Sequence, residues 1–94
     1  MAIPKRTLGH SGIEVSEVGF GAMPLSDLDT ADAVRLLREA LDRGCNFFDT
    51  APRYGFGRNE TQIGDAFHGM RDQVVICTKY GGSAGGFMDF SPEH

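Results

Sequence analysis

Asp49, Tyr54 and Lys79 are three side chains that together could move a proton under control. An unperturbed phenol titrates at about pH 10, so it gives up its proton poorly at neutral pH. An ammonium group beside a phenol favours the phenolate and lowers that pKa. A carboxylate paired with the ammonium would hold it in place and keep it charged. The set would act as a general acid toward a carbonyl oxygen while a cofactor supplies a hydride to the carbon.

The elements around these residues predict that they meet. A strand predicted over residues 45–48 ends at Asp49, and one predicted over residues 74–78 ends at Lys79. Alternate residues share one face of a strand, so Asp49 and Lys79 could point into a common space. Tyr54 lies on the loop that leaves the first of these strands. Active sites of α/β proteins are built at this edge, where parallel strands end.

Two helices separate the strands. The first begins at Asp29 or Thr30 and stops at Gly44, and the second spans residues 59–68 with Asn59 as its N-cap. The predicted apolar face of the first helix consists of residues at spacings of three and four: Ala33, Leu36, Leu37, Ala40 and Leu41.

Short strands flank the loop at residues 9–12 and predict a β-hairpin, and a further short strand is expected over residues 18–21. The order is therefore β-β-β-α-β-α-β, and alternation of this kind predicts parallel βα units whose strands all end on one rim. A flexible glycine-rich loop is expected over residues 81–86, and residues 91–93 have the pattern of a helix start.

Composition excludes several classes of function. The 94 residues are at most one domain, and no stretch approaches the roughly 20 apolar residues of a membrane helix. A net charge of −4 argues against a nucleic-acid surface. The chain begins without a secretory pattern, so we expect a cytoplasmic protein in which Cys45 and Cys77 are reduced core thiols. The histidines and cysteines have no metal-binding spacing, so we expect no metal site.

Each candidate residue also has a simpler structural interpretation. Asp49 could cap the following turn, Tyr54 could be a packed loop aromatic, and Lys79 could be a solubilising charge at a strand end. Their convergence on one predicted rim favours the catalytic interpretation. Tyr80 is a rival phenol, although it should face the opposite side of its strand. The glycines at 19 and 21 do not form the dinucleotide-binding pattern G-x-G-x-x-G, because that pattern needs a glycine at position 24, which is Pro24.

These residues belong to a longer pattern that resembles the aldo-keto reductase family. The matching segments follow the family's order and spacing, and the DTAxxYG segment joined to a later TK is specific. They are residues 6–12 (RTLGHSG), 18–23 (VGFGAM), 44–51 (GCNFFDTA), 54–64 (YGFGRNETQIG), 77–79 (CTK) and 91–94 (SPEH).

The resemblance implies part of a (β/α)8 TIM barrel whose bottom is closed by the N-terminal hairpin. It implies that NADPH or NADH serves to reduce aldehydes and ketones, or in reverse to oxidise alcohols and sugars. Carried over by position, Tyr54 is the proton donor, Lys79 lowers its pKa, and Asp49 supports Lys79. The resemblance places the nicotinamide end of the pocket at these residues: Gly21, Ala22, Met23 and Asp49.

The resemblance also sets expectations about the extent of the chain. The family's fourth catalytic residue, a histidine at the end of the fourth strand, would lie beyond position 94, and a barrel takes about 250 residues. Residues 1–94 are therefore expected to be the N-terminal part of one barrel domain, inactive alone and open to self-association through exposed sheet edges. The expected partner is a small carbonyl or sugar substrate. The alternative is a non-catalytic NADPH-sensing or binding subunit of the same fold.

Overall fold

Three short parallel strands form the centre of the computed structural model, which describes residues 3–82 and 88–89. They are β3 (Phe20–Gly21), β4 (Phe47–Asp49) and β5 (Val75–Cys77), and they lie in the order β3-β4-β5. Gly21 pairs with Asp49, and Asp49 pairs with Cys77, so the three strands end at the same level. The predicted alternation of strands and helices and the predicted shared rim are both confirmed.

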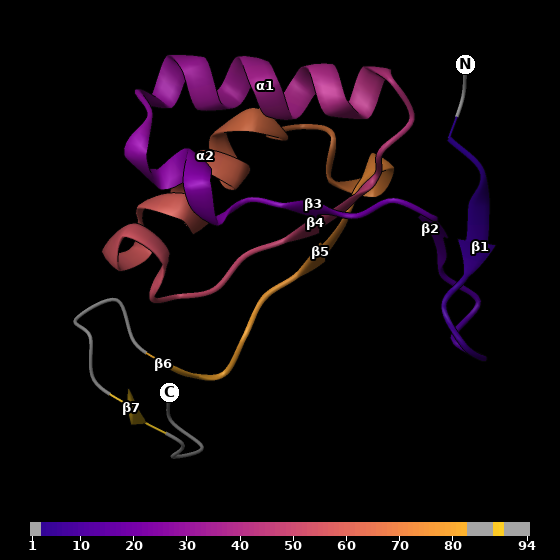
Figure 1. The fold of residues 1–94 in the computed structure, drawn as a ribbon. Helices are drawn as coiled ribbons and strands as arrows, with labels where there is room; N and C mark the ends of the chain where they lie inside the picture. Colours follow the sequence, from indigo (N-terminus) through magenta and orange to yellow (C-terminus); the bar gives the residue numbers. More distant parts are fainter. Residues whose placement is uncertain (1–2, 83–87, 90–94) are drawn as a thin grey trace.

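Two helices cover one side of this sheet (Figure 1). Helix α1 (Thr30–Asp42) connects β3 to β4, and helix α2 (Arg58–Ala66) connects β4 to β5. Short 3-10 turns over Met23–Asp27, Tyr54–Gly57 and Arg71–Gln73 complete the connections. The described helices are too short or too polar to span a lipid bilayer.

Phe48 is the centre of the core between the sheet and the helices. It is fully buried, and its ring lies 5.7 Å from that of Phe20 and 4.7 Å from that of Phe67, centroid to centroid. Because neighbouring strand residues face opposite sides, burial of Phe48 under the helices turns Asp49 to the other face. The other buried residues of this core are Ala22, Leu25, Ala33, Leu37, Ile63, Ala66 and Val74.

The hairpin lies at the opposite end of the sheet from the strand ends that could carry a site (Figure 1). Its strands β1 (Lys5–Thr7) and β2 (Glu14–Ser16) pair antiparallel. Asn46, just before β4, joins them to the sheet: its Oδ1 accepts from the Ser16 amide at 2.6 Å, and its Nδ2 donates to the Glu14 carbonyl at 3.0 Å. The hairpin therefore lies at the amino-end side of the sheet, where the resemblance placed it.

Several local expectations were wrong. The strand predicted over residues 45–48 begins at Phe47, because the amide of Cys45 still bonds to the end of α1 and Asn46 binds the hairpin. Cys45 is buried, but Cys77 is an exposed thiol at the end of the outer strand β5; both are free. Strand β6 (Gly81–Gly82) pairs with β7 (Met88–Asp89), where a loop without strands was expected. Residues 83–87 and the expected helix start at 91–93 lie outside the described residues.

The apolar face of α1 is narrower than its pattern predicted. Ala33 and Leu37 are fully buried, whereas Leu36 is 40 % exposed. With 3.6 residues per turn, Leu36 lies about 60° to one side of Ala33, at the edge of the buried stripe. As predicted, the helix starts after Asp29 and ends before Gly44, whose φ of 101° suits glycine.

The two adjacent leucines of α1 provide a matched test of this packing. Leu37→Ala should lower the free energy of unfolding by about 2–5 kcal/mol, because it opens a cavity in the core. Leu36→Ala should lower it by no more than about 1 kcal/mol. Urea unfolding of the protein as its source makes it measures both, and a larger loss for Leu36→Ala would contradict the orientation of the helix.

Candidate active site

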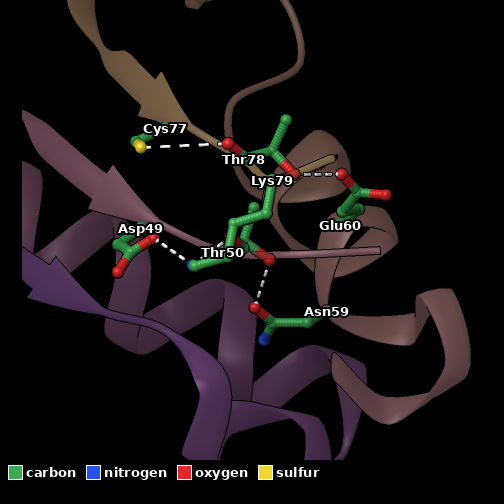
Figure 2. Close-up of polar contacts among 7 residues, drawn as sticks. All are labelled: Asp49, Thr50, Asn59, Glu60, Cys77, Thr78 and Lys79. Atoms are coloured by element: carbon green, nitrogen blue, oxygen red, sulfur yellow. Dashed lines mark hydrogen bonds and ion pairs between the residues drawn. The ribbon is translucent and has the colours of Figure 1, made fainter. Parts of the chain in front are cut away.

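An ion pair joins the carboxyl end of β4 to the segment that follows β5. The Nζ of Lys79 lies 2.7 Å from Oδ1 of Asp49 and 2.8 Å from the carbonyl oxygen of Thr50 (Figure 2). Strand register brings the two side chains together, since Asp49 pairs with Cys77 and Lys79 follows two residues later. The structure thus brings together two of the predicted site residues.

Tyr54 completes the predicted group of three. The Nζ of Lys79 is 4.9 Å from the centroid of the Tyr54 ring, within the range of a cation–π interaction. Lys79 is therefore in contact with the Asp49 carboxylate and with the aromatic ring of Tyr54. A phenol, an ammonium and a carboxylate therefore lie in contact in that order, a combination of groups that acid–base catalysis can use.

The contacts of Lys79 raise its pKa above the ordinary value of 10.5. The hydrogen bond to Asp49 is the largest cause, and contact with Tyr54 adds to it, while partial burial acts in the opposite direction. Lys79 is consequently an ammonium at neutral pH. Its side chain is 45 % exposed and that of Asp49 is 50 % exposed, so water screens the pair and its contribution to stability is below about 1 kcal/mol.

The loop after Tyr54 has an unusual backbone. Gly55, Phe56 and Gly57 all have positive φ, at 61°, 56° and 93°. Phe56 is a bulky residue in this region and is 76 % exposed, so its conformation is held by the loop and not by packing of its ring. A Cβ on Gly55 would lie 2.7 Å from Cβ of Ser26, so this loop is pressed against the 3-10 turn that follows β3.

Asn59 has a different role from the predicted one. It lies inside α2, which begins at Arg58 after Gly57, and it is fully buried. Its Oδ1 accepts from the Thr50 hydroxyl at 2.6 Å, and its Nδ2 donates to the Ala22 carbonyl at 2.7 Å. Gln62, one turn later, donates to the carbonyl of Leu25 at 2.9 Å. Sequence reasoning missed this network, although its spacing was visible: Asn59, Gln62, Ile63 and Ala66 share one helical face.

The expected cofactor residues border the pair from the end of β3. Gly21 is exposed, and a Cβ placed on it would meet nothing within 4 Å. Met23 is 53 % exposed, whereas Ala22 is fully buried and binds Asn59 through its carbonyl. The surface beside Asp49 is therefore open at Gly21 and Met23, which is compatible with a flat ring lying there. Among the described residues no cluster of histidine, cysteine and carboxylate side chains could hold a metal ion.

Comparison with known proteins identifies the family. The sequence model of the Aldo/keto reductase family matches residues 17–94, so this chain belongs to that family of oxidoreductases. It is 42% identical over 98 residues to L-galactose dehydrogenase of Arabidopsis thaliana, covering 97% of this chain and 30% of that protein. It is 41% identical over 90 residues to the uncharacterized oxidoreductase YqkF of Bacillus subtilis, covering 90% of this chain and 29% of that protein.

Solved structures that resemble this chain are also aldo-keto reductases. The aldo-keto reductase AKR11C1 from Bacillus halodurans, in its holo form, superposes with a TM-score of 0.80 at 42% identity, covering 85% of this chain and 26% of that one. The thermostable aldo-keto reductase Tm1743, in complex with the inhibitor epalrestat, gives a TM-score of 0.72 at 28% identity, covering 81% and 30%. These neighbours are TIM barrels, so the described residues form part of a (β/α)8 fold. The chain spans less than a third of the length of these relatives.

The contact between Lys79 and Asp49 predicts how Lys79 titrates. In the protein as its source makes it, Asp49→Asn should lower the pKa of Lys79 toward 10.5, because the largest cause of its rise is removed. Because the folded pKa is raised, the stability from the pair is present below pH 10.5 and is lost as pH rises through the folded value. Titration of the Lys79 Cε resonance by NMR measures the shift. Asp65→Asn on the surface of α2 is the control and should leave the titration unchanged; an unchanged titration in Asp49→Asn would contradict the contact.

The loop of positive φ at residues 55–57 gives a further prediction. Gly55→Ala should destabilise the protein by about 1–3 kcal/mol, because alanine is strained at this φ and would strike Ser26. Gly64→Ala is the matched control: it lies within α2 with nothing within 4 Å of the new Cβ, so it should stabilise by up to about 1 kcal/mol. Thermal unfolding compares them, and a neutral Gly55→Ala would show that the loop is not pressed against the turn.

Proposed function

We propose that this chain supplies the acid–base part of an NAD(P)H-dependent aldo-keto reductase site, which reduces a carbonyl or oxidises an alcohol or sugar. The observation that carries the proposal is the contact of Lys79 with both Asp49 and Tyr54, at the level where all three parallel strands end. Asp49, Tyr54 and Lys79 are the proposed catalytic residues.

Tyr54 is the proton donor in this proposal. Its hydroxyl gives a proton to the carbonyl oxygen, and the Lys79 ammonium stabilises the negative charge that remains on the phenolate. An ammonium has three N–H donors, and two are held by Asp49 and the Thr50 carbonyl. The third is left for the phenolic oxygen, in agreement with the contribution of Tyr54 to the raised pKa of Lys79.

A bound nicotinamide cofactor would supply the hydride to the carbon. Gly21, Ala22, Met23 and Asp49 are the residues of this chain proposed to border it. Gly21 lets the cofactor approach the backbone closely, since it has no Cβ. Ala22 keeps this segment in place through its carbonyl, which accepts from Asn59. The proposed cofactor is NADPH or NADH.

The substrate is proposed to be a small carbonyl compound or sugar. One relative is an L-galactose dehydrogenase, and another, 42% identical over 84 residues, is the pyridoxal 4-dehydrogenase of Microbacterium luteolum. The three parallel strands of the described part end without a histidine, so the fourth catalytic residue that the resemblance implies would come from elsewhere in the barrel. Cytoplasmic location, inactivity of residues 1–94 alone, and self-association through sheet edges remain predictions.

Tyr54→Phe tests the proposal. In the protein as its source makes it, carbonyl reduction should fall by about 10²-fold or more, because the proton donor is removed. Binding of the nicotinamide cofactor, followed by its fluorescence, should remain within a few fold. Tyr80→Phe, which removes the other phenol, is the matched control and should keep most of the activity.

The same variants separate an enzyme from a sensing subunit. A non-catalytic binding role predicts no turnover in the parent protein and no loss of function in Tyr54→Phe. Turnover that survives Tyr54→Phe would instead show that another group donates the proton.

A further inference from the structure

The first turn of α2 holds the carboxyl ends of all three parallel strands. Two consecutive residues, Asn59 and Glu60, make these contacts. Figure 2 shows the bonds with Thr50 and Thr78. The acidic side chain of Glu60 near a helix N-terminus would be favourable by itself, since it faces the positive end of the helix dipole. The bonds of Asn59 to Ala22 and Thr50, and the bond of Glu60 to Thr78, however, join the helix to the strand ends.

Asn59 joins the first two strands. Its Nδ2 donates to the carbonyl of Ala22, which follows β3, and its Oδ1 accepts from the hydroxyl of Thr50, which follows β4. Asn59 and Thr50 are almost fully buried, at 0% and 1% exposure. Hydrogen bonds in such a dry environment are strong, and an unpaired partner there is costly. The separation of these two strand ends is therefore tightly defined.

Glu60 holds the third strand end. The hydroxyl of Thr78, the residue after β5, donates to Oε2 of Glu60 at 2.6 Å. Lys79 is the next residue, so this bond fixes the backbone from which the lysine side chain starts. The same lysine reaches back to Asp49 and to the carbonyl of Thr50, whose hydroxyl binds Asn59. Asn59 and Glu60 thus act on the two ends of the ion pair.

We propose that Asn59 and Glu60 are positioning residues that set the distance between Asp49, Lys79 and the segment at Ala22. An exposed ion pair such as Asp49–Lys79 is too weak to define its own geometry, since water screens it and two flexible side chains must be ordered. The buried amide of Asn59 provides that definition for the first two strand ends. For the third, the Thr78–Glu60 bond is exposed but short and charge-assisted, and it ties the backbone next to Lys79 to the helix. The proposal rests on the proposed function for its effect on turnover, but not for its effect on the geometry of Lys79.

Variants of Thr78 test the Glu60 contact without changing the helix. In the protein as its source makes it, Thr78→Val removes the hydroxyl at nearly constant shape, and Thr78→Ser retains it. We expect Thr78→Val to lower kcat by about 10-fold with a smaller change in KM, because a displaced catalytic group is costly. The pKa of Lys79, measured from its Cε resonance, should move down toward 10.5. Thr78→Ser should keep both values near those of the parent.

A double-mutant cycle shows whether the two residues act through each other. Glu60→Ala should have the effect of Thr78→Val, and the double variant should be little worse than either single one. Asn59 is tested through its partner Thr50, because removal of the Asn59 side chain would disturb the buried Thr50 hydroxyl and the buried Oε1 of Gln62 together. Thr50→Val, which lacks the hydroxyl, should lower kcat by about 10-fold. Thr50→Ser, which retains the hydroxyl, should keep kcat near that of the parent.

Glu39→Ala is the matched control. It removes a carboxylate that accepts from Arg43 at 3.0 Å on the surface of α1, far from the strand ends, and should change neither kcat nor the pKa of Lys79. Folded variants of Thr78 and Glu60 with the parent kcat and the parent Lys79 titration would overturn the proposal, as would additive effects in the cycle. If the parent protein shows no carbonyl reduction, the proposed function fails, and the Lys79 titration alone then decides the positioning role.

Discussion

The register in which β4 pairs with β5 is the constraint on which the candidate site depends. Asp49 lies opposite Cys77, and this places Lys79 close enough for its Nζ to reach the carboxylate at 2.7 Å. A slip of one residue would turn every side chain of β4 to the other face, which would send Asp49 into the core and Phe48 into solvent. Burial of Phe48 between the rings of Phe20 and Phe67 resists that slip, so the apolar core and the polar site are specified together.

The site combines an exposed ion pair with a buried network of hydrogen bonds. Lys79 and Asp49 are about half exposed, which leaves them accessible to a substrate and limits their effect on stability. Behind them lies the buried amide network of Asn59 and Gln62, in which, within the described residues, no buried side-chain nitrogen or oxygen lacks a partner. The buried network therefore fixes the geometry from the interior, while the proposed chemistry would take place at the exposed strand ends.

Much of this arrangement could be predicted from the sequence, because it follows from periodicity. Alternating patterns fix the order of strands and helices, and strand parity brings Asp49 and Lys79 to one space. What could not be predicted depends on partners distant in the chain. Asn59 has the type of an N-cap but becomes buried because Thr50 and Ala22 satisfy its amide. Cys77 lies in an apolar run, yet its strand is outermost among the described strands and leaves it exposed.

The most direct test of this account is a crystal structure of the protein as its source makes it. The account predicts that Nζ of Lys79 lies within hydrogen-bond distance of Oδ1 of Asp49, close to 2.7 Å, with the ring of Tyr54 beside it. The same map should show Thr78 bonded to Glu60 and Thr50 bonded to Asn59. A structure in which Asp49 faces the helices, or in which Lys79 points away from both Asp49 and Tyr54, would contradict the register and with it the proposed site.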